Sequence, residues 1–573
     1  MKGVIVGISA LLLTACQPVA PPEPAAPAAP GAPAAPAAPA APAPQTAPGT
    51  STDAFYVDPW SLGFDQPKNK GGTVTYASNL AVPNLDPWLE NVRAHPYLDM
   101  VYDTLIAKQL KPGVLSIAGV PMICRLCESW DLAADKKTYT FKLRQNVKWH
   151  DGKPFTADDV QFSYEKALDP KTAFRSRSNL TGIASMEVVN QATIKLVTKE
   201  PDAEFIDKLG ASIPIVPKHA FDTGVDLNKT AVGTGPFKHG SFRSDVEYVA
   251  VRNPDFWLPD RPVVDSMVGK FITDNSTRIS AFIAKQIDLI QIPTKKELDP
   301  VTRTVPDAKV DTLHHVNVNS FLVNTKKPPL SDKRVRKAIH LALDRQALSQ
   351  PVSFGLGVNN VAPSAPAQWQ ARSITQEELS KLPGYRQPKD QDIAEAKRLL
   401  AEAGFPDGFK TSSMHVATFV GMPEHNEAAS ADLKKIGVDV TIQPTEAGLL
   451  AKKRSECDFD LAGETMVGSS RAVSLVQVYS RYATGGSENY CGFSHPEIDR
   501  LVPEMERELD ENRRWQLVKQ IQTVLLEELP SVPFPETVSF AVYHPYVHNW
   551  RNYGSAVGYV WYPTAELMWV DKR

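Results

Sequence analysis

The sequence lacks an excess of charge of either sign. It contains 62 lysines and arginines against 65 aspartates and glutamates, for a formal net charge of −3. It also lacks the combination of arginines and aromatic residues that marks RNA- and DNA-binding modules. Without a basic footprint for the phosphate backbone, we expect no nucleic-acid partner.

Short catalytic motifs are absent as well. The sequence has no Gly-x-Ser-x-Gly elbow, no His-Glu-x-x-His zinc helix and no Walker phosphate loop. Asp158 and Asp159 are adjacent near a helix start, so they diverge around the helix and cannot flank one scissile bond. We expect a protein that is not an enzyme and has no cofactor. An exported hydrolase that depends on His150 or Asp151 is the alternative.

Cysteine is scarce, with five residues in the chain. Apart from Cys16, these are Cys124, Cys127, Cys457 and Cys491, an even number that indicates disulfides in an exported protein, with three possible connectivities. Cys124-Arg-Leu-Cys127 could instead be a redox dithiol, although the setting of a thioredoxin-like unit is missing. His219, His314 and His315 show no metal-ligand spacing with either pair, so we expect no metal site.

Long hydrophobic runs are missing except at the N-terminus. Residues 4–13 form an apolar run after Lys2, and this run is shorter than the about 20 residues that span a bilayer. Leu13-Thr14-Ala15-Cys16 then closes it in the manner of a bacterial lipoprotein signal. We therefore expect residues 1–15 to be removed and Cys16 to carry a lipid that anchors the exported protein to the membrane, facing the periplasm or the extracellular side. An ordinary signal peptide with an incidental Cys16 is the alternative.

Proline and alanine dominate the segment that follows. Residues 17–51 contain little else, and such a tract favours an extended spacer of about 3 Å per residue, or up to about 90 Å in total. We interpret residues 16–54 as a tether between the membrane and a globular part. The alternative is low-complexity sequence without a selected length.

The remaining chain mixes strand and helix patterns. In residues 139–144, Tyr139, Phe141 and Leu143 fall on one face, which predicts a half-buried strand. Thr156 is placed to cap the next helix. Further helical periodicities occur at residues 335–343, 393–403 and 512–528. Strands and helices without long repeats predict an α/β protein.

Four strings in order give the chain a family resemblance: VKWHDGKPFTADDV at residues 147–160, GTGPF at 233–237, RNPDFW at 252–257, and KPPLSDKRVR at 327–336 with Asp344-Arg345 behind it. Over residues 72–570 the chain thereby resembles the family 5 extracellular solute-binding proteins. That family feeds peptides, opines, nickel chelates or short sugars to ATP-driven bacterial importers. The resemblance implies a monomer that captures a small solute, above all a peptide, and delivers it to the permease of an ABC importer.

The resemblance also implies a fold of two lobes with a cleft between them, the first lobe carrying an extra subdomain. The chain would cross between the lobes near residues 321–325 and 535–540. The two cysteine pairs would then lie in different lobes, which implies the disulfides Cys124–Cys127 and Cys457–Cys491. The implied divisions are lobe I at 55–105, 223–322 and 540–573, the subdomain at 106–222, and lobe II at 323–539.

Position within the family points to six ligand-binding residues in the cleft, each of which could instead have a packing role: Trp88, Asn319, Trp369, Glu464, Thr465 and Tyr490. Peptide binders of the family carry an aspartate in an Asp-Pro-rich turn after the strand that holds Glu464, where it pairs with the peptide's amino group. This chain has no such aspartate or proline, so Glu464 would take that role, or Arg471 would bind an acidic ligand. A structural lipoprotein that binds a partner through its surface is the remaining alternative.

Overall fold

The computed structural model describes residues 62–78, 82–88, 96–109, 121–210, 213–314, 318–357, 359, 374–417, 419, 421–466, 475–486, 488–550 and 564–571. The predicted signal peptide and tether, residues 1–54, lie outside these residues, as do Cys16, Trp369 and Arg471. None of the helices within the described part combines the length and the apolar character that crossing a bilayer requires.

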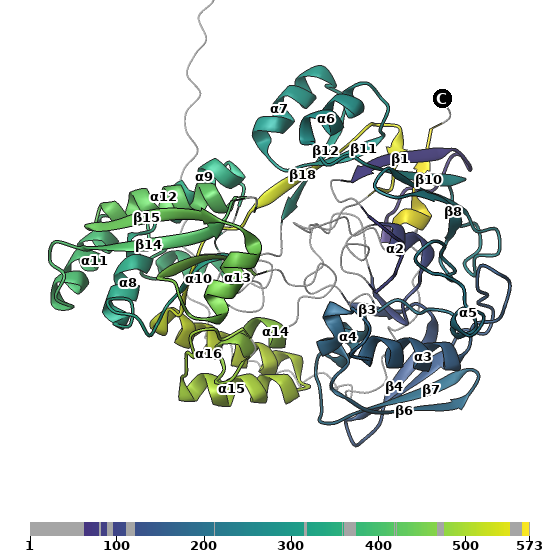
Figure 1. Ribbon diagram of the computed structural model, residues 1–573, viewed down its shortest axis with the longest axis horizontal. Coiled ribbons are helices and arrows are strands. Elements are labelled where there is room, and N and C mark those ends of the chain that lie inside the picture. The colour runs from purple at the N-terminus through teal and green to yellow at the C-terminus, as the bar shows by residue number, and fades with distance from the viewer. Residues whose placement is uncertain are drawn as a thin grey trace, which may run out of the picture. The chain divides into compact units, whose positions relative to one another are not determined.

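A mixed seven-stranded sheet forms lobe I (Figure 1). Its order is β12-β18-β11-β1-β10-β9-β8, and β1 runs parallel to both of its neighbours. Helices α6 (Asn275–Ile283) and α7 (Lys295–Thr304) bury Phe282, Leu298 and Val301 against this sheet. The strands are β1 (Thr73–Ser78), β8 (Phe237–Arg243), β9 (Glu247–Arg252), β10 (Ser266–Phe271), β11 (Leu289–Ile292), β12 (Lys309–His314) and β18 (Val538–Tyr543).

The inserted subdomain is built on an antiparallel sheet in the order β4-β5-β7-β6. The predicted strand is β5 (Thr138–Leu143), in which Tyr139, Phe141 and Leu143 are buried. Helix α3 (Ala157–Leu168) begins after Thr156, whose backbone N–H donates to Asp159 Oδ2 at 3.0 Å. The other elements are β2 (Ile106–Lys108), β3 (Met122–Cys124), β4 (Cys127–Leu132), β6 (Ile183–Asn190), β7 (Thr193–Thr198), α4 (Phe205–Leu209) and α5 (Lys218–Asp222). Helix α2 (Pro96–Val101) precedes the subdomain and packs against β8 and β9 of lobe I.

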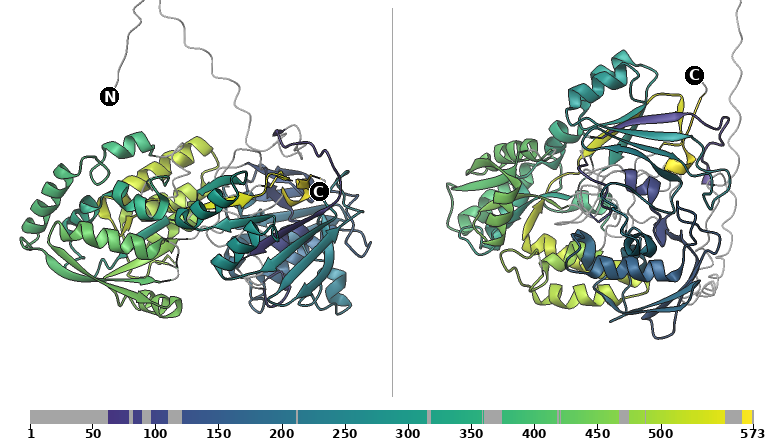
Figure 2. Two further views of the ribbon diagram at one scale, coloured as in Figure 1. Left: turned by 90° about the horizontal axis from the view of Figure 1, so that it is seen from above. Right: turned by 45° about the vertical axis from the view of Figure 1, so that its right-hand side comes forward.

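Lobe II contains a five-stranded sheet in the order β15-β14-β16-β13-β17. The predicted helices at 335–343 and 393–403 are α8 (Lys333–Ala342) and α11 (Asp390–Glu402), which share one core with α12 (Met422–Lys434) and the sheet. In both views of Figure 2, the green segments of lobe II lie on one side of the molecule and the blue segments of the subdomain lie on the other. The strands are β13 (Val318–Val323), β14 (Phe409–Val416), β15 (Val438–Thr445), β16 (Leu461–Met466) and β17 (Ser531–Pro533).

A second, helical cluster completes lobe II. The predicted helix at 512–528 is α16 (Glu511–Glu528), which packs its buried Val518, Ile521 and Leu525 against α14 (Leu475–Tyr479) and α15 (Pro496–Arg507). The remaining helices of the lobe are α9 (Arg345–Ser353), α10 (Gln376–Lys381) and α13 (Ala447–Ser455).

The chain passes between the two sheets twice. Strand β12 ends at His314 in the lobe I sheet, and β13 begins at Val318 in the lobe II sheet. The first crossing therefore precedes the expected residues 321–325, because Phe321 and Val323 already pack in the lobe II core. The second crossing, between β17 and β18, occupies residues 533–538. Strand β13 thus belongs to lobe II, and β18 belongs to lobe I.

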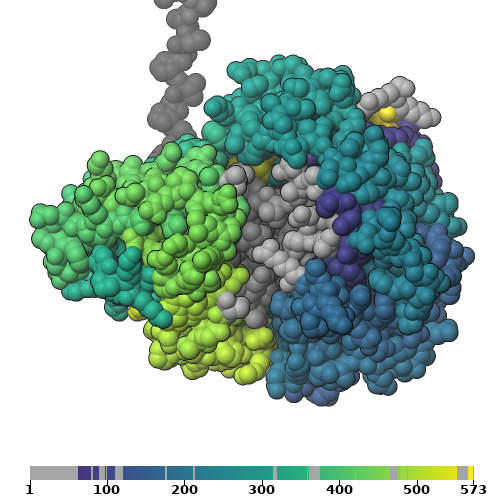
Figure 3. All heavy atoms as spheres, in the orientation of Figure 1, coloured from purple at the N-terminus to yellow at the C-terminus, as the bar shows by residue number. Residues whose placement is uncertain are grey.

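The subdomain also touches lobe II through its own surface. Ala203 donates its backbone N–H to the Glu506 carbonyl at 3.0 Å, and Arg514 Nη1 donates to the Ala203 carbonyl at 3.3 Å. Lys208 Nζ lies 3.8 Å from Glu506 Oε1. Figure 3 shows the blue subdomain meeting the yellow-green helices of lobe II. The lobes are thus joined by side-chain and backbone contacts in addition to the two crossings.

Candidate functional site

The paired strands β13 and β16 carry three of the residues predicted to bind ligand. In their antiparallel register, Asn319 lies opposite Thr465, and Ser320 lies opposite Glu464. Both Asn319 and Glu464 are buried, and the Asn319 carbonyl accepts the Phe534 N–H at 2.8 Å. These strands adjoin the first crossing, so they lie where the two lobes are connected. The side chain of Thr465 falls outside the described part of the chain.

Strand alternation separates two of these predicted residues. Gly463 approaches the side chains of Met422 and Asn426 on α12, whereas Ala462 joins a cluster with Leu450 and Cys491 on the other face. Because successive residues of a strand point to opposite faces, Glu464 shares the face of Ala462. By the same rule, Asn319 shares the face of Phe321, which packs in the helix-covered core. Asn319 and Glu464 therefore do not meet at one site.

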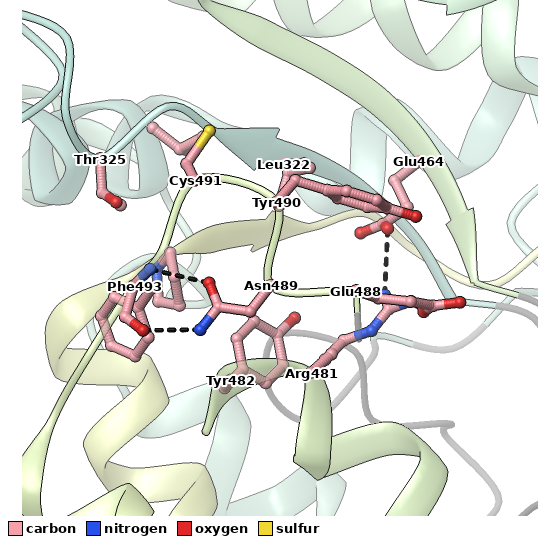
Figure 4. A pocket seen from close by; sticks show the side chains of 12 residues that line it. Leu322, Thr325, Glu464, Arg481, Tyr482, Glu488, Asn489, Tyr490, Cys491 and Phe493 are labelled. Atoms are coloured by element: carbon pink, nitrogen blue, oxygen red, sulfur yellow. Dashed lines mark hydrogen bonds and ion pairs between the residues drawn. The ribbon is translucent and has the colours of Figure 1, made fainter. Parts of the chain in front are cut away.

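A pocket opens on the Glu464 face of lobe II, and Figure 4 shows the side chains around it. Glu464 comes from β16 and Thr325 follows β13, whereas the other polar groups come from the segment between α14 and α15. Tyr490 lies in this wall, so the structure brings Glu464 and Tyr490 together. The lining residues are Leu322, Val323, Thr325, Glu464, Arg481, Tyr482, Glu488, Asn489, Tyr490, Cys491, Phe493 and Pro530.

Buried charges dominate this pocket. Arg481 Nη1 lies 3.1 Å from Glu464 Oε1, and Arg454 Nη1 lies 3.7 Å from the same oxygen. The side chains of Glu464 and Arg481 are only 3% and 7% exposed. Arg481 Nη2 also pairs with Glu488, whose side chain is 46% exposed. We call Arg454, Glu464, Arg481 and Glu488 the charge cluster.

Electrostatics keeps Arg481 charged inside this cluster. Burial disfavours the guanidinium charge, but the adjacent Glu464 carboxylate outweighs it, so the pKa of Arg481 is raised. Tyr490 contributes to the same effect, and its ring also lies under the Arg454 guanidinium at 5.4 Å from its centroid. The pocket therefore holds a permanent cation beside an aromatic wall.

Several polar atoms at this site have no hydrogen-bond partner within the described residues. They are Glu464 Oε2, Arg481 Nε, Arg454 Nε and Ser320 Oγ, and the Arg481 Nη1 contact with Glu464 is likewise an ion pair without hydrogen-bond geometry. Buried polar groups are usually hydrogen-bonded, because leaving one unpaired costs about 1–3 kcal/mol. The charge cluster therefore has hydrogen-bonding capacity left for a polar ligand.

Trp88 lies elsewhere. It is buried in the core that lobe I and the subdomain share, and its ring meets Phe174 edge-on with centroids 5.4 Å apart. The structure does not bring Trp88 to the charge cluster. One disulfide lies beside the charge cluster: Cys457 and Cys491 are bonded, with sulfurs 2.10 Å apart, and Cys491 lines the pocket. The other disulfide, Cys124–Cys127 at 2.03 Å, lies in the subdomain. Both pairs are those that the resemblance implied.

Sequence reasoning missed Arg454, Arg481 and Glu488. A signal for two of them was present, because Arg454 precedes Cys457 by three residues and Glu488 precedes Cys491 by three. A disulfide between these cysteines places both near Tyr490. Nothing comparable marks Arg481. Among the described residues, no group of three or more histidines, cysteines or acids is arranged to hold a metal ion.

Comparison with known proteins gives a consistent result. The family model for bacterial extracellular solute-binding proteins, family 5, matches residues 122–484. Di/tripeptide-binding protein 1 of Pseudomonas aeruginosa is 28% identical over 469 residues, which is 76% of this chain and 84% of the relative. Heme-binding protein A of Haemophilus influenzae is 29% identical over 531 residues, which is 84% of this chain and 90% of the relative.

Solved structures share the two-lobed fold. The periplasmic binding protein DppA of Helicobacter pylori, in complex with the peptide STSA, superposes with a TM-score of 0.69 at 24% identity, covering 88% of this chain and 99% of that one. The substrate-binding protein CtaP of Listeria monocytogenes gives 0.74 at 21% identity, covering 88% and 100%. The predicted fold class, a two-lobed α/β binding protein, is confirmed.

Proposed function

The chain belongs to the bacterial extracellular solute-binding proteins of family 5, and we propose that the solute it captures for an ABC importer is a peptide or a similarly small molecule. Relatives bear the names of di/tripeptide-binding, dipeptide-binding, glutathione-binding and heme-binding proteins. Peptides are the most frequent among these names. Capture and delivery require no bond to be made or broken, so we propose no enzymatic activity.

One observation supports a small polar solute in particular. The charge cluster places the buried Arg481 and Glu464 beside Tyr490, close to the strand that leaves the first crossing. The residues that line the pocket all belong to lobe II, and small-molecule sites in general combine aromatic walls with a few placed polar groups. Such a site suits a solute with charged ends, which is what a peptide is.

The charge cluster also refines the role proposed for Glu464. Two arginines already approach its carboxylate, so Glu464 is a poor partner for a ligand's ammonium group. We propose that Glu464 orients Arg481, and that an amine would bind elsewhere in the cleft. Asn319, Trp369, Thr465 and Tyr490 remain proposed contacts, and the packing of Trp88 favours a structural role for that residue.

Binding is proposed to couple to lobe movement. A solute held between lobes favours the closed form only as far as it binds that form better than the open one. The protein would act outside the cytoplasm as a monomer, held at the membrane by a lipid on Cys16 and the tether at 16–54. The closed form would then present its solute to the permease.

Native mass spectrometry of the full-length protein, followed by denaturation, tests the solute class. We expect peptides of a few residues to be released, and tri-alanine to raise the melting temperature of the emptied protein. Release of a heme group or a sugar instead would replace the solute while leaving the transport role. A protein that retains nothing and does not respond to a panel of di- to pentapeptides would contradict the proposal.

A further inference from the structure

The charge cluster contains two carboxylates that differ in how firmly they are held. Glu464 is buried on a central strand of the lobe II sheet, and its side chain is 3% exposed. Glu488 lies in the turn between α14 and α15, and its side chain is 46% exposed. Both approach the guanidinium of Arg481 (Figure 4). One partner of Arg481 is therefore built into the core, and the other reaches it from the surface.

The backbone that carries Arg481 is held in place on both sides. Two residues before Arg481, the Tyr479 hydroxyl accepts a hydrogen bond from Gln522 Nε2 at 2.9 Å. On its other side, the Tyr482 hydroxyl lies 3.3 Å from Ser531 Oγ. Both tyrosines are buried. The backbone at Arg481 is thus anchored on α16 and β17, and its side chain points into the pocket beside Glu464.

The turn that carries Glu488 is fastened through its neighbour. The Asn489 side chain donates to the carbonyls of Ala483 and Phe493 at 2.9 and 2.6 Å, and its Oδ1 accepts the Phe493 N–H at 2.7 Å. Gly485 adopts a φ of 78°, a conformation that glycine tolerates without strain. The backbone of the turn can therefore stay in place while the Glu488 side chain rotates towards solvent.

We propose that Glu488 stands in for a ligand carboxylate, and that an incoming ligand displaces it to pair its own carboxylate with Arg481. This inference rests on the proposed function, since it assumes a small solute in the pocket. With Glu488 in place, the two arginines balance the two glutamates of the cluster. With Glu488 turned outward, the cluster carries one uncompensated positive charge. A single anionic group of a ligand would neutralise this charge.

The exchange avoids the main cost of a buried charge. A buried guanidinium without its counter-ion is strongly destabilising, whereas replacing one carboxylate by another leaves no buried charge unpaired in either state. Arginine also binds a carboxylate through two parallel N–H donors, which gives geometric selectivity. Arg481 is thus assigned as the residue that selects ligands with a free carboxylate.

Calorimetric titration of the full-length protein with tri-alanine and with tri-alanine amide, which lacks the carboxylate, tests this assignment. We expect the wild type to prefer the acid by about tenfold or more, as suits a charge-assisted contact. E488Q removes the internal competitor, so it should tighten binding of the acid by about threefold and leave the amide unchanged. R481K retains the charge but loses the paired donors, and it should reduce the preference for the acid.

The matched control is E497Q, which removes a carboxylate from an exposed pair with Arg500 at 2.8 Å in the same lobe. It should change neither affinity. Equal binding of acid and amide by the wild type would overturn the assignment while leaving peptide capture intact. Weaker binding of the acid by E488Q would also overturn it, because a purely structural Glu488 would behave in that way. Binding of neither peptide would overturn both the assignment and the proposed solute.

Discussion

Leu475 donates its backbone N–H to Glu204 Oε1 at 2.6 Å, and this hydrogen bond joins the inserted subdomain to lobe II. Glu204 precedes α4 and is only 6% exposed, and Leu475 is the first residue of α14. The contact lies among the other bonds that Ala203 and Lys208 make to lobe II. Because it spans the two lobes, it stabilises the arrangement in which they are together.

Replacing Glu204 should shift the protein towards an open form. A hydrogen bond to a charged acceptor contributes about 1.5–3 kcal/mol, so E204A should weaken solute binding by about tenfold or more. Small-angle X-ray scattering should show a larger radius of gyration for the ligand-free variant than for the wild type. E200Q is the control, because Glu200 is 67% exposed and pairs with Lys137, which also belongs to the subdomain. An unchanged radius and affinity for E204A would contradict this role.

Arg125 should be a major determinant of stability. It lies between the bonded Cys124 and Cys127, and it donates to Asp103 at 2.8 Å and to Glu566 at 2.5 Å, with all three side chains almost fully buried. R125M would leave two buried carboxylates without this partner, which typically costs about 3–5 kcal/mol. Urea denaturation should show this loss.

A matched arginine on the surface provides the comparison for that variant. Arg398 pairs with Glu395 and Glu402 on α11 and is 53% exposed. R398M should therefore change the free energy of unfolding by about 1 kcal/mol or less. Equal effects of the two substitutions would show that Arg125 is not the centre of a buried network.

His425 should make the protein less stable in mild acid. It is fully buried beside Phe534, with ring centroids 5.0 Å apart, and burial lowers its pKa to about 3. An unfolded histidine titrates near pH 6.5. Below that pH, His425 binds a proton in the unfolded state but stays neutral in the folded state. The free energy of unfolding therefore falls as the pH approaches the folded-state pKa.

The substitution H425F should flatten this decline between pH 6.5 and 4, by up to about 1.4 kcal/mol for each pH unit. Urea midpoints measured at several pH values would reveal the difference in slope. His150, whose pKa burial lowers to about 4, contributes in the same direction and would remain in the variant. H495N serves as the control, because His495 is a partly exposed cap of α15 that asparagine can replace. A slope identical to wild type in H425F would contradict the prediction.

Cys16 should determine where the protein resides. If it carries the lipid, C16S should leave the membrane fraction and appear in the soluble extracytoplasmic fraction, because an acyl anchor supplies most of the membrane affinity. Fractionation followed by immunoblotting distinguishes the two locations. C457S, which removes a cysteine far from the N-terminus, should stay at the membrane. Retention of C16S at the membrane would contradict lipidation.

Local patterns in the sequence were sufficient for several of the regular elements. The alternation of Tyr139, Phe141 and Leu143 predicted β5, and the helical spacing from Val335 onward predicted α8. These predictions succeeded because strand and helix periodicity is a property of neighbouring residues. The first crossing was placed too late, since the hydrophobic residues of β13 pack in lobe II and a hydrophobic pattern does not say which core it joins.

The charge cluster was beyond such reasoning. Glu464 and Arg481 are 17 positions apart, on a strand and a short helical turn, and only the tertiary packing, in which the neighbouring Tyr479 and Tyr482 contact Gln522 of α16 and Ser531 of β17, brings them within 3.1 Å. Trp88 packs in the core with Phe174, away from the charge cluster, so its part in ligand binding stays a prediction. Position along the chain does not determine which way a side chain faces.

The amino-acid sequence by itself determined the family, the mixed α/β character and the expectation of an exported protein tethered at its N-terminus. These features depend on short-range motifs and composition, which can be read without coordinates. Only the tertiary structure decided which charges meet in lobe II and which surfaces join the subdomain to that lobe. Ion pairs and hydrogen bonds act over a few ångströms between residues that are distant in sequence, so their partners are chosen by the folded packing.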